Sequence, residues 1–447
     1  TARHNDEHSN TVEVNIYTPI SEETLDTMGT VDTSVGNVLA SKTFDNATEE
    51  ERKQLIEGEL NALSETGMIA ADSILYIEEA GIISFQYAGG LLGGVMMRDF
   101  DEDFDGNVPY ATDTNALQSP LSDEEKQQLW AERKEAGDNS SNPIRPMSVG
   151  SEGDKLGSAI ILNAFPAFES DPANIAFRTD FYVDLKTEWD GKGLQTTLDT
   201  DVTVDDFKNL DSNYDIICVS THGSTYEWRD GFLWLNQHRY PAICLAENST
   251  KALDKKYSVE LKDKQIVKVA TSTGTCYWIL PALIEKAYAS SELDDSFVFV
   301  QCCQSKGKDG NVDNSMSDAF ESSSLEAYVG YHNSVYSVYG REFMKTYVDQ
   351  LIENETAQAA FDAAVLAHGA NHRVWFENQG GTYDNNVPVA YPILSGSTTA
   401  TLFQTGIQNG DFSSMTDILF GYPLSWNREG DVRSISQLGE IKTQGLL

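Results

Sequence analysis

Residues 295–307 read DSFVFVQCCQSKG, an apolar run that ends abruptly in a glutamine and two adjacent cysteines. The run at 297–300 is β-branched and aromatic and has polar residues on both sides, which predicts a buried strand of a parallel sheet. Cys302 and Cys303 would then follow the carboxyl end of this strand. Ligands and chemistry collect at that edge of open α/β sheets, because its loops are free to present side chains. The sequence therefore predicts a thiol at a functional edge.

A second apolar run ends in a histidine. Residues 214–223 read YDIICVSTHG, so a strand over 214–220 would deliver His222 and Gly223 to the same edge of the same sheet. A thiol becomes a good nucleophile at neutral pH when a neighbouring imidazole takes its proton. Gly223 has no Cβ, so its backbone N–H can approach a substrate and form an oxyanion hole with the N–H of Cys303. These residues predict a catalytic cysteine–histidine dyad.

The two blocks resemble those of the caspase-like superfamily of cysteine peptidases (clan CD), which includes caspases, clostripain, gingipains and legumains. In that superfamily an apolar block with His-Gly precedes an apolar block that ends in a small residue and the nucleophilic cysteine. Here His222 and Gly223 precede Cys303 in the same order. The resemblance implies that Cys303 is the nucleophile. A cysteine stands at 302 where alanine is usual, so Cys302 remains an alternative reactive thiol.

The resemblance, which covers roughly residues 157–400, implies a cysteine endopeptidase closest to the clostripain and gingipain enzymes. Such an enzyme acts on a protein or peptide substrate and requires no cofactor. Substrate contacts are expected from Gln301 and Ser305. In the family, the residue two before the nucleophile helps line the pocket for the side chain that precedes the cut. Gln301 is neutral, as in caspases, whereas clostripain-type enzymes tend to carry aspartate there, so specificity for basic residues does not follow.

Other classes of protein fit the same residues. A single buried cysteine is usually a small core residue, and a chain that keeps the fold without reactivity would be an inactive scaffold. A protein that binds glycans or other proteins through its tail would use the core as a structural body. Redox chemistry at the adjacent pair Cys302 and Cys303 is disfavoured, because a disulfide between neighbouring residues is strained. The conjunction of both blocks favours the dyad.

The remaining pattern predicts an α/β fold with a mostly parallel sheet and helices on both faces, because strands and helices alternate from residue 159 onward. The resemblance implies the same arrangement, a caspase-like α/β/α sandwich. Strands are expected at 159–165, 195–203, 214–220, 297–300 and 327–331, and helices at 177–189, 204–210, 281–289, 316–325, 339–352 and 356–368. Between the two blocks, the segments 232–235, 258–261 and 265–269 are interpreted as hairpin strands beside the cleft.

Four parts are expected along the chain. Residues 1–136 would form a small α+β module, with strands at 11–17, 74–77, 82–87 and 91–97 and a helix with a capping box over 48–66. Residues 137–154 mix Gly, Ser, Asn and Pro and predict a linker. The peptidase domain would span 155–401. The β-rich segment 402–447 resembles the start of a β-sandwich module that continues in a longer protein; a tail that packs on the peptidase is the alternative. Because clan CD peptidases are often made as precursors, 1–136 is a candidate prodomain; an ordinary linker at 137–154 is the alternative.

The charge balance limits the partners. With 31 basic and 70 acidic residues the net charge is −39, which repels nucleic acid phosphates and anionic membranes. No run approaches the roughly 18 apolar residues that a membrane span needs. The chain begins with Thr1 and a polar stretch, which we interpret as following a removed signal peptide. Together with the resemblance, this suits a secreted or cell-surface bacterial protein.

A calcium site is one interpretation of residues 101–106, which read DEDFDG. Asp101, Asp103 and Asp105 stand at alternate positions before a glycine, as in the first half of an EF-hand loop. The twelfth position is Thr112, so the bidentate glutamate of that loop is missing. An acidic surface turn is the alternative.

The prodomain hypothesis predicts a cut in the linker 137–154, which contains Arg145. Incubation of the purified protein under activating conditions should produce a new amino terminus within these residues, and sequencing of the amino termini measures it. If no cut falls within 137–154 under any such condition, the segment is an ordinary linker.

Overall fold

The computed structural model describes residues 18–97, 157–168, 172–210, 214–231, 234–288, 293, 295–308, 311–378, 383 and 388–402. The chain divides into two units, Thr1–Ala400 and Thr401–Leu447, and the description below concerns the first unit. The predicted strand at 11–17, the linker at 137–154 and nearly all of the segment 402–447 lie outside the described residues.

Both sequence blocks belong to a six-stranded sheet with the order β15–β14–β11–β6–β4–β5. The strands from β5 to β14 pair in parallel, and β15 pairs antiparallel with β14. The bounds are Gly157–Asn163 (β4), Leu194–Asp199 (β5), Ile216–Ser220 (β6), Phe297–Gln301 (β11), Ala327–His332 (β14) and Tyr391–Gly396 (β15). Every residue of β6 and β11 is buried, as expected for apolar strands covered on both faces. The strands predicted at both blocks are confirmed.

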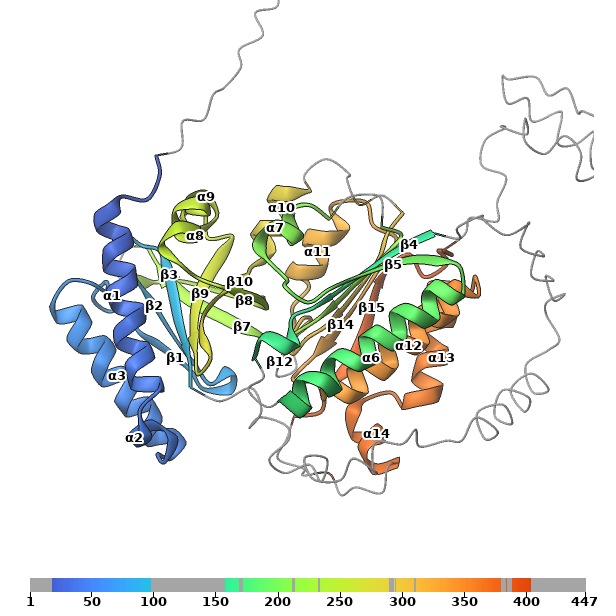
Figure 1. Ribbon diagram of the computed structural model, residues 1–447, viewed down its shortest axis with the longest axis horizontal. Helices are drawn as coiled ribbons and strands as arrows, with labels where there is room; N and C mark the ends of the chain where they lie inside the picture. Colours follow the sequence, from blue (N-terminus) through green and yellow to red (C-terminus); the bar gives the residue numbers. More distant parts are fainter. Residues whose placement is uncertain are drawn as a thin grey trace, which may run out of the picture. The chain divides into compact units, whose positions relative to one another are not determined.

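Helices cover both faces of this sheet (Figure 1). One face carries α6 (Pro172–Gly191), α12 (Ser337–Ile352) and α13 (Ala357–His368), and the other carries α7 (Val204–Lys208), α10 (Pro281–Ala287) and α11 (Ser315–Glu321). The short helices η3 (Phe165–Phe168) and α14 (His372–Asn378) and the hairpin of β12 (Gly307–Lys308) and β13 (Asn311–Val312) complete this part. The arrangement is mixed α/β and is compatible with the expected α/β/α sandwich.

A second sheet, which the sequence pattern did not predict, has seven strands in the order β1–β2–β3–β9–β10–β8–β7. Only β3 and β9 pair in parallel among these neighbours. The strands are Leu75–Ile77 (β1), Ile82–Gln86 (β2), Leu92–Met96 (β3), Gly223–Asp230 (β7), Asn236–Asn248 (β8), Ile266–Thr271 (β9) and Gly274–Ile279 (β10). The helices beside it are Glu22–Leu39 (α1), Lys42–Asp45 (α2), Glu49–Glu65 (α3), Glu78–Ala80 (η1), Lys251–Lys256 (α8) and Ser258–Lys262 (α9).

This sheet changes the expected domain organisation. The short strands β1, β2 and β3 occur where the sequence predicts them, but they continue the sheet formed by β7 to β10 instead of forming a separate module. One cluster of buried apolar side chains runs from α1 to β11 and includes Met28, Ile56 and Val298. The strand predicted at 258–261 is wrong, because α9 is helical there. Among the described residues, no helix is both long and apolar enough to cross a bilayer.

A buried ion-pair network fastens α1 to the second sheet. Lys268 of β9 is 1% exposed and contacts Asp32 of α1 at 2.6 Å and Asp254 of α8 at 2.7 Å. The hydroxyl groups of Tyr87 and Tyr277 donate to Asp32 and Asp254, at 2.5 and 2.7 Å. Burial raises the pKa of Asp32, although the ammonium of Lys268 opposes the shift. The lysine therefore compensates two carboxylates that the fold removes from water.

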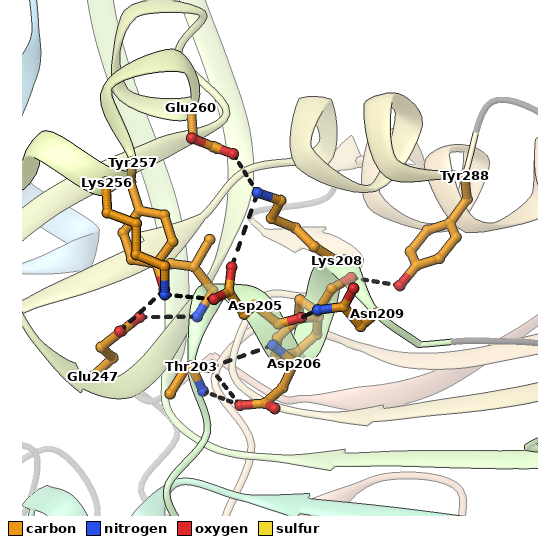
Figure 2. Close-up of polar contacts among 12 residues, drawn as sticks. Thr203, Asp205, Asp206, Lys208, Asn209, Glu247, Lys256, Tyr257, Glu260 and Tyr288 are labelled. Carbon is orange, nitrogen blue, oxygen red and sulfur yellow. Dashed lines mark hydrogen bonds and ion pairs between the residues drawn. The ribbon is translucent and has the colours of Figure 1, made fainter. Parts of the chain in front are cut away.

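A second set of ion pairs joins α7, which covers the first sheet, to helices of the second sheet (Figure 2). Lys208 contacts Glu260 at 2.5 Å, and Lys256 contacts Asp205 at 2.5 Å. Glu247 of β8 accepts a hydrogen bond from the first N–H of α7 at 3.0 Å. Oppositely charged side chains of α7 and of the helices α8 and α9 thus face one another across this junction.

Replacing Lys268 with methionine should destabilise the protein by about 3–5 kcal/mol at neutral pH, because the substitution leaves buried carboxylates without a counter-charge. Burial raises the pKa of Asp32 and Lys268 opposes the rise, so in the folded variant without Lys268 this carboxyl gains a proton at higher pH than in the folded wild type or in the unfolded state. Protonation therefore stabilises the fold as the pH falls through the folded-state pKa, and the deficit of Lys268→Met should shrink there. Urea unfolding at a series of pH values measures it.

The control for this experiment is Lys251→Met. The ion pairs of Lys251 with Glu22 and Asp26 are solvent-exposed, so its loss should change stability little at any pH. A deficit of Lys268→Met that stays constant from neutral to acidic pH would contradict the proposed proton uptake.

Candidate active site

The pairing of β6 with β11 brings the two blocks together. Ser220 and Gln301 are partners in this parallel pair. His222 and Cys303 each lie two residues beyond those partners, so both emerge at the carboxyl edge of adjacent strands. The backbone N–H of Thr221 donates to the carbonyl of Gln301 at 3.1 Å, which extends the pairing one step toward the site.

Gly223 lies directly against the turn that carries the cysteines. A Cβ at this position would lie 2.6 Å from Sγ of Cys302 and 2.9 Å from the carbonyl oxygen of Cys303. Side-chain carbon atoms do not approach other atoms so closely, so only glycine fits here without displacing the turn. The sequence predicted glycine for close approach to a substrate; the structure adds a close approach to the cysteine turn.

The two adjacent cysteines differ in accessibility. Cys303 is partly exposed, and its Sγ lies 3.8 Å from the carbonyl oxygen of Val335, a hydrogen-bond contact for a thiol. Cys302 is 1% exposed, and burial raises its pKa well above the ordinary value for a thiol. A buried thiol with a raised pKa is a poor nucleophile because little thiolate forms. These features favour Cys303 over Cys302 as the reactive thiol.

His222 is held by aromatic rings and by the neighbouring sheet. Its imidazole is half-buried and packs edge-on against Phe165 and Phe168 of η3, at centroid distances of 4.8 and 5.4 Å. Its carbonyl accepts a hydrogen bond from the N–H of Cys244 at 3.0 Å. Sequence reasoning did not single out the two phenylalanines. The available signal was their position at the end of the predicted strand 159–165 and three residues beyond it, at the same sheet edge.

The structure revises the expected role of Gln301, which is 1% exposed. Its Oε1 accepts hydrogen bonds from the hydroxyls of Tyr182, at 2.8 Å, and Ser220, and its Nε2 donates to the carbonyl of Ser337 at 3.0 Å. Its side chain packs against Gly340, where a Cβ would lie 2.7 Å from Gln301 Cγ. Both ends of the amide are therefore occupied by the protein. Gln301 holds β6, α6 and α12 in place instead of lining a substrate pocket.

Ser305 is also buried, at 1% exposed, so its predicted contact with substrate is not supported. Its hydroxyl accepts the N–H of Tyr331 at 2.8 Å and lies 3.3 Å from the carbonyl oxygen of Cys302. Gln304 before it adopts a left-handed backbone with φ of 59°, and its Oε1 accepts the N–H of Thr225 at 2.8 Å. These side chains fasten the cysteine turn to β14 and β7.

A fully buried lysine follows the turn. Nζ of Lys306 donates to Asn314 Oδ1 at 3.1 Å, Ser317 Oγ at 2.5 Å and Ser395 Oγ at 2.9 Å, and lies 5.1 Å from the ring centroid of Tyr328. Burial lowers the pKa of Lys306 to about 8. Three oxygen atoms match the three protons of an ammonium group, so this lysine ties the turn to α11 and β15. Sequence reasoning treated this residue only as the polar end of the strand.

The candidate calcium ligands Asp101, Asp103 and Asp105 lie outside the described residues. Within the described ranges, no group of three or more His, Cys, Asp or Glu side chains has the geometry to hold a metal ion.

Comparison with known proteins does not identify a family. No family model matches the chain, and no curated protein matches it. The function is therefore argued from the geometry of the site.

Gly223→Ala should destabilise the protein by about 1–3 kcal/mol, because the new Cβ overlaps Cys302 and the carbonyl of Cys303. Adding Cys302→Ala removes the Sγ atom and should recover part of the loss, with a coupling of at least about 0.5 kcal/mol in a double-mutant cycle. Thermal or urea unfolding of the four proteins measures it.

The control is Gly58→Ala in the middle of α3, where a Cβ would meet nothing within 4 Å. This change should stabilise the protein by up to about 1 kcal/mol, because alanine is the better helix former. Strictly additive effects of Gly223→Ala and Cys302→Ala would contradict the close contact at the site.

Proposed function

We propose that this protein is a cysteine endopeptidase of the caspase-like kind, with Cys303 as nucleophile and His222 as its acid–base partner. The observation that carries the proposal is the close packing of Gly223 on the turn that contains Cys302 and Cys303. A Cβ added at Gly223 would lie 2.9 Å from the carbonyl oxygen of Cys303. The backbone of the His-Gly block and that of the cysteine block thus meet at one edge of one sheet. Acyl transfer needs such a juxtaposition of a nucleophile, a base and backbone donors.

The proposed reaction has two halves. The sulfur of Cys303 attacks the scissile carbonyl carbon after its proton passes to His222. The imidazolium then donates that proton to the nitrogen of the leaving amine, and the carbonyl-side fragment stays on the sulfur as a thioester. Water, whose proton His222 accepts, hydrolyses the thioester and restores the thiol. The atoms of the chain return to their starting protonation state after each turnover.

The proposed oxyanion hole consists of the N–H groups of Gly223 and Cys303. Donors of this kind lower the barrier most when they need no rearrangement as charge develops. Gly223 is the first residue of β7, and Gln304 directly after Cys303 accepts a hydrogen bond from Thr225 of β7. Gly223 and the turn that contains Cys303 are therefore both held by strand β7. This restraint supports a preorganised hole.

The proposed substrate is a protein or peptide. Gln301 and Ser305 have their polar groups bound inside the protein, so selectivity is assigned to other walls. The segment Asn333 to Val335 lies beside the turn, since Gln304 N–H donates to the carbonyl of Asn333 at 2.9 Å and Cys303 Sγ contacts that of Val335. We assign the wall for the side chain that precedes the cut to this segment.

The dyad predicts selective labelling by a peptidyl acyloxymethyl ketone, an electrophile that reacts with catalytic thiols. Wild type should be labelled at Cys303, and the rate should fall by about 10²–10⁴-fold in His222→Ala, because the base no longer takes the thiol proton. Mass spectrometry of the labelled peptides measures the site and the rate.

Cys302→Ala is the matched control, since it removes the neighbouring thiol and keeps Cys303; its labelling should stay close to wild type. Labelling at Cys302 in the wild type would shift the nucleophile by one residue. Unchanged labelling in His222→Ala, or none in wild type before and after trimming of the chain, would favour the inactive scaffold.

A further inference from the structure

Two further thiols, Cys244 and Cys276, lie in the second sheet next to the backbone of His222. Cys244 is on β8 and Cys276 is on β10, and their Sγ atoms are 3.6 Å apart. Cys244 pairs with Trp278, while Cys276 pairs with Asn248 across a register shift, so the two cysteines are diagonal neighbours on one sheet. Both side chains are at most 1% exposed. Although the cysteines are far apart in sequence, their sulfur atoms lie in contact.

Cys244 also fastens the histidine loop. Its backbone N–H donates to the carbonyl of His222 at 3.0 Å, and its carbonyl accepts the hydroxyl of Thr221 at 2.7 Å. The residue that contacts the second thiol thus also binds the side-chain hydroxyl of Thr221 and the backbone carbonyl of His222. A displacement of Cys244 must be absorbed by these two hydrogen bonds or passed to His222.

The surroundings limit the reactivity of Cys244 while the sheet is closed. Burial raises the pKa of Cys244 well above the ordinary value for a thiol, and the neighbouring Cys276 and Cys302 raise it further. A neutral, buried thiol is inaccessible to bulky or charged disulfides. A small uncharged oxidant such as hydrogen peroxide can reach it when the sheet opens locally.

We propose that Cys244 and Cys276 form a reversible disulfide and that this bond displaces the His222 loop, so that the pair is a redox control of the site. In the first step, which requires the sheet to be locally open, the Cys244 sulfur loses its proton to solvent and attacks one oxygen of hydrogen peroxide. The O–O bond breaks, the hydroxide that leaves takes up a proton from solvent, and the products are a sulfenic acid and water. The sulfur of Cys276 then attacks the sulfenic sulfur, and a second water leaves with the thiol proton. Two thiols are oxidised and one peroxide is reduced by two electrons.

The distance between the two sulfur atoms indicates how oxidation should change the rate of the reaction. A disulfide has an S–S distance of about 2.05 Å, so the two sulfur atoms must approach by about 1.5 Å from their present separation. The part of this movement that side-chain rotation does not take up must come from the backbone of β8 or β10. A misplacement of about 1 Å of a catalytic group costs up to about 100-fold in rate. Oxidation should therefore slow the reaction that uses His222.

The test begins with chemistry that does not depend on activity. Cys303→Ala protein, which lacks the exposed thiol, is treated with hydrogen peroxide, alkylated and digested. The expected result is a linked peptide pair containing Cys244 and Cys276 that a thiol reductant separates. Hydrogen exchange of peptides over 219–226 should rise on oxidation in this protein and stay unchanged in Cys303→Ala proteins that also carry Cys276→Ala or Cys276→Ser.

The effect on rate rests on the proposed function and is measured separately. Wild type, Cys276→Ala and Cys276→Ser are oxidised while a reversible peptidyl aldehyde protects Cys303, and the aldehyde is then removed. Wild type should lose at least about 10-fold in peptidase rate relative to both variants and recover with reductant. If none of these proteins cleaves peptides before oxidation, the proposed function is wrong. The linked peptides and the hydrogen exchange over 219–226 still test whether the disulfide forms and displaces the His222 loop.

Three results would overturn it. One is the absence of a bond between Cys244 and Cys276 after oxidation, and another is a bond from Cys244 to Cys302 instead. The third is a Cys244–Cys276 bond that leaves exchange over 219–226 unchanged, because the histidine loop would then not respond to it.

Discussion

The parallel pairing of β6 with β11 is the constraint on which the site depends. All five residues of each strand are buried, so a slip of one residue would turn apolar side chains away from their contacts on both faces. The register therefore fixes which residues emerge together at the carboxyl edge. Once Ser220 opposes Gln301, the His-Gly and cysteine segments begin at the same level and have to pack against one another. Gly223 is the residue that makes this packing sterically feasible.

The turn after β11 is polar in sequence and buried in the structure. Gln301, Gln304, Ser305 and Lys306 are each at most 4% exposed, and each is hydrogen-bonded to a different neighbouring element. Buried polar groups of this kind are costly unless all of their hydrogen bonds are made, and a turn built from them has few alternative conformations. The half-buried thiol of Cys303 thus sits in a segment whose other side chains are fixed by partners remote in sequence.

The sequence predicted strands and helices well where a regular pattern of apolar residues corresponds to a buried face in the structure. The strands at β6, β11 and β14 and the helices α12 and α13 fall where they are expected, because short β-branched and aromatic runs with polar flanks favour buried strands, and longer stretches with apolar residues at helical spacing favour helices. The second sheet was missed because its pairing is long-range: β3 and β9 are far apart along the chain, and the polar start of β8 conceals a strand of 13 residues. The positions of Cys303, His222 and Gly223 follow from two strand ends. The burial of Gln301 and Ser305 depends on Tyr182 and Tyr331, which no local pattern connects to them.

The placement of β1 to β3 changes what a cut in the segment before β4 would achieve. These strands hydrogen-bond to one another, and β3 is paired along β9, while α1 is held by Asp32 on Lys268. Cleavage of the peptide chain between β3 and β4 removes none of these contacts. The product would be a two-chain molecule in which the amino-terminal fragment remains a subunit, much as a nicked protein keeps its fold. Any activation by such a cut would come from freeing new chain ends, since the shared core holds the fragment in place.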